Sequence, residues 1–136
     1  MNFIGNVILL GLVTLCLAKY TEKQNQFTAD VYAKCAIELA MVIDSDFIER
    51  SKITGNVFTN DEASKKLLAC WYTQAGMIDS DGNIRVQALV DYLSEGRDVQ
   101  ALTDVVEKCA TVDGDTVEDK AYNFEQCFWK ELTFEL

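Results

Sequence analysis

The sequence predicts a single all-α domain of five or six short helices. Apolar residues recur at i, i+3, i+4 and i+7 along most of the chain after residue 19, which is the period of an amphipathic helix. No segment alternates convincingly between apolar and polar residues as a half-buried strand would, and the 136 residues include no proline to interrupt a helix. That length suits one hydrophobic core and is too short for two ordinary ones.

The amino-terminal segment is predicted to be a secretory signal peptide. Phe3–Leu17 is almost wholly apolar and carries no charged side chain. It is shorter than the roughly 20 residues of a membrane span, and Cys16 and Ala18 supply small residues for cleavage. We therefore expect residues 1–18 to be removed and residues 19–136 to form a secreted, extracellular domain. A buried amino-terminal helix is the alternative.

The first predicted helix begins at a capping box. In Thr21-x-x-Gln24 the first and fourth side chains can each bond the other residue's backbone N–H. A short second helix is expected over residues 44–50, and Gly55-Asn56 indicates a turn after it. Helical spacing assigns five residues to the apolar face of the first helix: Val31, Cys35, Leu39, Val42 and Ile43.

The central helix is expected to begin at Thr59-x-x-Glu62, which has the form of a second capping box, and to end at Gly76. The next helix is expected to end near Gly96, and the last to begin at Thr116. The inward faces of these four later helices are predicted to be Ala63, Leu67, Cys70 and Trp71; Val86, Leu89, Val90 and Leu93; Leu102, Val105, Val106 and Cys109; and Phe124, Cys127, Phe128 and Leu132.

The acidic segment 79–83 resembles the start of a calcium-binding EF-hand loop. Such a loop needs glycine at its sixth position and glutamate at its twelfth, where this chain has Ile84 and Val90. We therefore expect no metal here, but a polar turn in which Gly82 takes a positive φ.

Composition excludes several functions. The chain has no histidine and a net charge of -10. Ser-His-Asp and Cys-His catalysis, histidine metal sites and histidine pH switches are therefore excluded. The acidity disfavours a nucleic-acid partner, because neutralising phosphates requires clustered Lys and Arg. We expect no enzyme, no cofactor and no membrane insertion.

Four cysteines remain once the leader is removed: Cys35, Cys70, Cys109 and Cys127. An even number in a small secreted domain predicts two disulfides, with three possible connectivities. A zinc site is disfavoured because the chain has neither a C-x-x-C pair nor a histidine. Four free cysteines are the remaining alternative.

The segment 68–84, LACWYTQAGMIDSDGNI, resembles the central signature of insect odorant-binding proteins. That signature is a cysteine-bearing helix, then Gly-hydrophobic-hydrophobic-Asp, then a Gly-Asn turn into the next helix. The four cysteines fall where the first, third, fourth and sixth cysteines of the family lie. Lys66 and Glu118 occupy the second and fifth places, which is the pattern of the four-cysteine, or C-minus, subgroup.

The resemblance implies helices around an internal apolar cavity, with the pairings Cys35–Cys70 and Cys109–Cys127. We further hypothesise that Lys66 and Glu118, which replace a bonded cysteine pair, form an ion pair instead.

The resemblance also implies which residues bind a ligand. Position by position it carries over Leu68, Tyr72, Met77 and Ile84, with Phe128 as an aromatic wall. Leu89 and Val106 are added from inward helical faces, and Phe134 of the apolar tail is a candidate lid. Tyr72 is the expected orienting hydrogen-bond donor. For Trp71 and Trp129 a structural role is favoured.

The function implied is a secreted carrier that solubilises small hydrophobic odorants or semiochemicals. Its expected partners are such ligands, with an olfactory receptor or a second copy of the chain as further possibilities. One alternative is a carrier or scavenger of other hydrophobic molecules outside olfaction. From a different class, a helical signalling or interaction protein with a filled core also fits the pattern.

Overall fold

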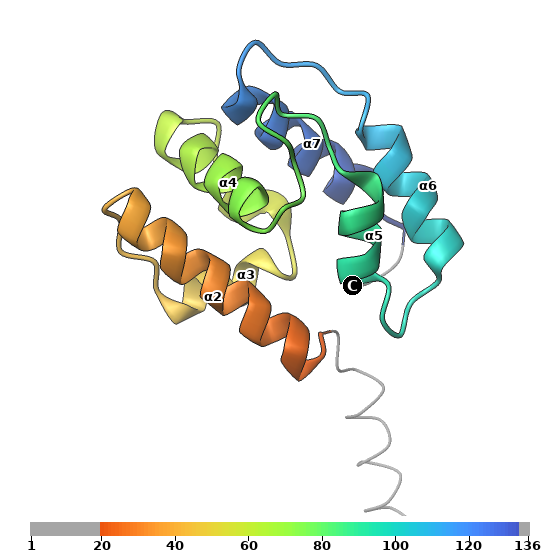
Figure 1. Cartoon of the computed structure of the whole chain (residues 1–136), viewed down its shortest axis with the longest axis horizontal. Coiled ribbons are helices and arrows are strands. Elements are labelled where there is room, and N and C mark those ends of the chain that lie inside the picture. The colour runs from red at the N-terminus through yellow and green to blue at the C-terminus, as the bar shows by residue number, and fades with distance from the viewer. Residues whose placement is uncertain (1–19, 134–136) are drawn as a thin grey trace, which may run out of the picture.

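The computed structural model describes residues 20–133, which form six α-helices and one 3-10 turn (Figure 1). In chain order these are α2 (Glu22–Glu38), α3 (Ser45–Ser51), η1 (Gly55–Val57), α4 (Glu62–Gln74), α5 (Val86–Leu93), α6 (Val99–Cys109) and α7 (Val117–Glu131). The β structure within this range is an isolated antiparallel bridge between Ile78 and Ile84. The predicted all-α fold class is confirmed.

Two predictions for the ends of the chain lie outside the described residues: the signal peptide over 1–18 and the candidate lid Phe134. Among the helices of residues 20–133, none has both the length and the apolar character to cross a bilayer.

Local signals placed most helix boundaries correctly. Thr21 and Gln24 form the predicted capping box, and Thr116 accepts a hydrogen bond from the backbone N–H of Asp119 at the start of α7. The predicted capping box at Thr59 is wrong, because Asp61 is the N-cap of α4 and accepts from the backbone N–H of Ser64. The Thr59 hydroxyl donates to the Asp61 carboxylate instead. Aspartate caps a helix well, since its oxygens accept orphan backbone N–H groups and its charge suits the helix dipole.

The predicted apolar face of the first helix extends too far. Helix α2 ends at Glu38, Leu39 is its C-cap, and Ala40 has a φ of 51° that cannot continue the helix. Val42 is therefore 98% exposed rather than packed on the core. Helical periodicity alone does not reveal this end, since neither glycine nor proline marks it.

Helices α4 and α7 pack side by side as the central pair, with α2 against α4 and the α5–α6 hairpin alongside (Figure 1). Cys35–Cys70 joins α2 to α4, and Cys109–Cys127 joins α6 to α7. Both pairings implied by the family resemblance are confirmed. The core between the helices contains the fully buried Phe124, Leu102 and Val106.

The ion pair expected between Lys66 and Glu118 is replaced by one formed by their neighbours. Lys65 Nζ lies 2.9 Å from Asp119 Oδ1 and links α4 to α7, and this contact lowers the pKa of Asp119. Lys66 instead pairs with Glu62 one turn earlier on α4, at 2.8 Å. Lys66 and Glu118 still border the same groove between the two helices. Residues four apart on a helix are already neighbours, so the Lys66–Glu62 pair forms without bringing two helices together.

The loop between α4 and α5 is the polar turn predicted from its sequence. The Asp79 carboxylate accepts the backbone N–H groups of Asp81 and Asn83, which lowers its pKa. Gly82 has the expected positive φ of 85°, and a Cβ there would press on the Lys120 side chain. Gly76 ends the helix before this loop with a φ of 73°, as predicted.

Candidate functional site

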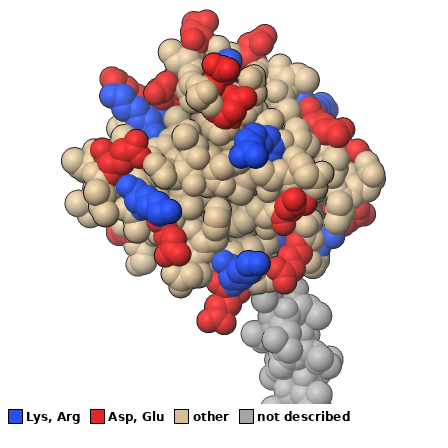
Figure 2. Space-filling view, in the orientation of Figure 1, with Lys and Arg blue, Asp and Glu red and all other residues tan. Residues whose placement is uncertain are grey.

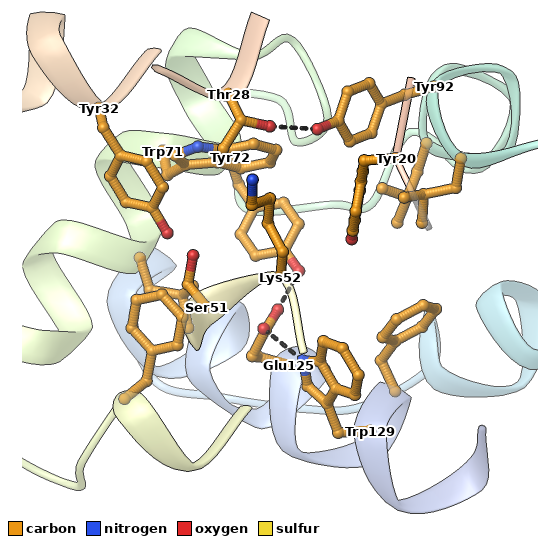
Figure 3. A pocket seen from close by; sticks show the side chains of 15 residues that line it. Tyr20, Thr28, Tyr32, Ser51, Lys52, Trp71, Tyr72, Tyr92, Glu125 and Trp129 are labelled. Atoms are coloured by element: carbon orange, nitrogen blue, oxygen red, sulfur yellow. Dashed lines mark hydrogen bonds between the residues drawn. The ribbon is translucent and has the colours of Figure 1, made fainter. Parts of the chain in front are cut away.

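A cavity of about 70 Å³ lies between α2, α3, α4, α5 and α7 (Figure 3). Its wall is mainly aromatic, with three leucines and four polar or charged side chains. The aromatic residues are Tyr20, Tyr32, Phe58, Trp71, Tyr72, Tyr92, Phe128 and Trp129. The remaining lining residues are Leu68, Leu89, Leu93, Thr28, Ser51, Lys52 and Glu125.

The rings of the wall contact one another. Trp71 lies at the centre of one group, with its ring centroid 5.5 Å from Tyr72 and 6.0 Å from Tyr92. At the other end Phe128 packs against Trp129 at 5.8 Å. Such edge and tilted contacts hold large apolar surfaces in fixed positions.

Trp129 approaches the backbone of η1 closely. Added to Gly55, a Cβ would collide with the indole ring of Trp129, so glycine is required for this contact. The Gly55-Asn56 turn predicted from sequence therefore also positions one wall of the cavity.

Glu125 on α7 is the only charged side chain among the buried residues of 20–133, and it is 7% exposed. Tyr72 donates its hydroxyl to Glu125 Oε2, and Trp129 Nε1 donates to Glu125 Oε1 at 2.7 Å (Figure 3). Burial raises the pKa of Glu125 above its ordinary value, while the two hydrogen bonds act in the opposite direction. Burial also raises the pKa of Tyr72 well above its ordinary value.

Lys52 and Tyr20 form one border of the cavity, and the Lys52 side chain is only 11% exposed. The Lys52 ammonium donates to Asn25 Oδ1 at 2.7 Å and to Glu49 Oε1 at 2.8 Å, and it lies 5.8 Å from the centroid of the Tyr20 ring. Arg97 lies on the same ring, with its Cζ 5.1 Å from the centroid. This border is thus held by cation–π contacts and hydrogen bonds to exposed groups.

A second hollow of about 340 Å³ lies on the far side of Tyr92, between α2 and α5. Tyr92 borders both spaces. Its hydroxyl is hydrogen-bonded to Thr28 in the cavity, and its ring lies 5.1 Å from Phe27 in the second hollow. Gln24 Nε2 donates to the Tyr92 carbonyl at 2.7 Å. Tyr92 therefore forms the partition between cavity and hollow.

The structure brings four of the eight predicted ligand residues together: Leu68, Tyr72, Leu89 and Phe128 all line the cavity. Met77 lines the second hollow, and Val106 is fully buried in the core. Ile84 packs, partly buried, against that core and is in the wall of neither space.

Sequence reasoning missed Glu125 and favoured a structural role for Trp71 and Trp129, both of which line the cavity. The signal for Glu125 was present, since Ala121, Phe124 and Phe128 place position 125 on the inward stripe of the last helix. A carboxylate in such a stripe is either paired or functional. Tyr92, by contrast, reaches the cavity through contacts with Gln24, Phe27 and Thr28 of α2, which no local pattern indicates.

Over residues 20–133 these features define a helical, disulfide-linked protein with an aromatic cavity and one buried carboxyl group. The model of the PBP/GOBP family matches residues 17–131, and the chain belongs to that family. No curated protein sequence matches the chain significantly.

Two solved structures share the fold. The fatty acid binding protein OBP56a from the oral disk of the blowfly Phormia regina has a TM-score of 0.64 and 16% identity, covering 84% of this chain and 96% of its own. The odorant-binding protein dmelOBP28a from Drosophila melanogaster has a TM-score of 0.62 and 21% identity, covering 78% of this chain and 89% of its own.

Proposed function

We propose that this protein is a secreted carrier that takes up small hydrophobic molecules, such as odorants or semiochemicals, in the cavity around Glu125. The observation that carries the proposal is the wall of the cavity, in which aromatic rings surround a few polar groups. Ligand sites typically combine a mainly apolar lining with a small number of orienting polar groups. Membership of the PBP/GOBP family supports a carrier of small hydrophobic ligands rather than an enzyme.

Affinity would come from removing apolar ligand surface from water, at about 25 cal/mol per Å². The cavity of about 70 Å³ is smaller than a typical ligand pocket, which occupies roughly 300–1,000 Å³. A ligand of about ten heavy atoms therefore requires part of the wall to move. Tyr92 has the room to do so, because the second hollow of about 340 Å³ lies beside it.

Two alternatives have support of their own. A carrier outside olfaction is supported by the blowfly protein, which is described as fatty acid binding and comes from the oral disk. A helical signalling or interaction protein with a filled core is supported by the small volume of the cavity. An olfactory receptor or a second copy of the chain as partner stays a prediction.

The proposal is tested by titrating the secreted protein with the fluorescent apolar probe N-phenyl-1-naphthylamine and displacing the probe with terpenoids, phenylpropanoids and long-chain alcohols. We expect saturable binding that weakens in Phe128→Ala, because Phe128 lines the cavity. Ile37→Ala is the matched control, since Ile37 is 84% exposed, and it should bind as the wild type does. Absence of probe binding would favour the filled-core protein.

A further inference from the structure

We propose that the cavity selects ligands with a protonated amino group, binding small aryl- or alkylammonium ions with Glu125 as the counter-charge. The inference rests on the proposed carrier function, because it names the ligand class of the same cavity.

Glu125 is paired only with neutral hydrogen-bond donors among the described residues. Both of its oxygens accept hydrogen bonds, but the donors, Tyr72 and Trp129, are neutral. Within residues 20–133 no Lys or Arg forms an ion pair with it. Buried carboxylates in proteins are normally paired with a cation or retain a proton. A ligand ammonium group would supply the cation that the described chain does not.

The wall around Glu125 is mainly aromatic. Glu125 lines the same cavity as the rings of Tyr20 and Tyr32, so its carboxyl group and these aromatic side chains border one space. Aromatic faces attract organic cations, more strongly when water is excluded. A carboxylate within an aromatic wall therefore offers an ammonium ion both a counter-charge and favourable ring contacts.

Lys52 also lines the cavity and carries the opposite charge. Its ammonium is already engaged by Asn25 and Glu49 at the border of the cavity. A carboxylate ligand placed near Lys52 would still face Glu125 inside, whereas an ammonium group beside Glu125 is attracted. The net charge of -10 also favours the approach of cations. Figure 2 shows acidic side chains distributed over one face, with Lys and Arg interspersed.

The test compares three ligands of similar size and different charge: 2-phenylethylamine, 2-phenylethanol and 3-phenylpropanoate. Each displaces N-phenyl-1-naphthylamine from the secreted wild-type protein at neutral pH. We expect the amine to bind at least tenfold more tightly than the alcohol, and the anion to bind most weakly. This comparison uses only the wild-type protein, so it does not depend on whether a variant folds.

In Glu125→Gln the amine should lose at least tenfold in affinity while the alcohol changes less than threefold. Glu131→Gln is the matched control, because Glu131 lies on the same helix and pairs with Lys108 outside the cavity. It should keep the preference for the amine.

Equal binding of amine and alcohol, tightest binding of the anion, or an amine preference that survives Glu125→Gln would each overturn the inference and leave the carrier function intact. If neither the probe nor any of the three ligands binds, the carrier function itself is contradicted, and the inference falls with it.

Discussion

Trp129 donates its indole N–H to the carboxylate of Glu125, 2.7 Å away and one helical turn earlier on α7. Together with the Tyr72 hydroxyl from α4, it satisfies one acceptor on each oxygen of a carboxyl group buried among aromatic rings. Because the donors come from two helices, the central α4–α7 pair fixes where this group lies. The position of the buried carboxyl group is therefore set by the packing of α4 against α7 and not by Glu125 alone.

The Trp129–Glu125 hydrogen bond should contribute measurably to stability. We expect Trp129→Phe to lower the free energy of unfolding by about 1–3 kcal/mol, because it leaves a buried acceptor without its donor. Urea denaturation provides the measurement. Trp71→Phe is the matched control, since Trp71 Nε1 is buried without a hydrogen-bond partner, and it should cost less. An equal or larger cost for Trp71→Phe would contradict this reading.

Stability should depend on pH through Glu125. Burial raises its folded-state pKa above the ordinary value of 4.5, so the folded state binds more protons between these two values. The contribution of Glu125 to the free energy of unfolding is then fully present below about pH 4.5 and is lost as the pH rises through the folded-state pKa. The stability of wild type relative to Glu125→Gln should thus fall as the pH rises above about 4.5.

Urea denaturation of both proteins across that range measures the difference directly. The aspartates with lowered pKa values, Asp61, Asp79 and Asp119, lose stability as the pH falls, but they are present in both proteins and cancel. A difference that stays constant with pH, or rises, would show that Glu125 is not held in a desolvated site.

Removing the Tyr92 partition should enlarge the usable space. We expect Tyr92→Ala to join the cavity to the second hollow and to tighten the binding of bulky ligands such as N-phenyl-1-naphthylamine, at a cost of about 2–4 kcal/mol in stability. Fluorescence titration gives the affinity. Tyr92→Phe keeps the ring and removes only the hydroxyl bonded to Thr28, so it should leave that affinity nearly unchanged. Weaker binding by Tyr92→Ala would contradict this role, because it would show that the ligand needs the Tyr92 ring as part of the cavity wall.

A third disulfide should form in the double variant Lys66→Cys/Glu118→Cys, because both positions border one groove between α4 and α7. We expect it to raise the free energy of unfolding by about 2–4 kcal/mol in the oxidised protein. Mass spectrometry under non-reducing conditions detects the bond, and each single variant serves as a control. If the oxidised double variant keeps two free thiols, the register inferred for these positions is wrong.

The fold was largely predictable because its signals are local. Local backbone chemistry marks the helix boundaries at Thr21 with Gln24, at Thr116 and at Gly76. It also marks the turn at Gly82. The end of α2 escaped prediction because Ala40 adopts a left-handed conformation that its residue type does not indicate. The disulfide pairing required the family resemblance, since four cysteines alone leave three connectivities open.

The cavity was predictable only in part. Tyr72 and Phe128 occupy family positions on α4 and α7, so the resemblance places both in the wall. Met77 follows the end of α4, and the turn there directs it to the second hollow instead. The ion pair was displaced by one position along each helix, which charge pattern alone cannot resolve, because Lys65 and Lys66 are adjacent and each has an acidic partner.

The chain contains two tryptophans, and both line the cavity. Their indole N–H signals in a two-dimensional ¹H–¹⁵N NMR spectrum therefore report directly on whether a ligand enters it. Titration with 2-phenylethanol should shift both signals along one saturating curve, with the larger change at Trp71, whose N–H has no partner to lose. If 2-phenylethanol displaces the fluorescent probe but leaves both indole signals unmoved, the account is contradicted, because the ligand would then lie outside the aromatic cavity.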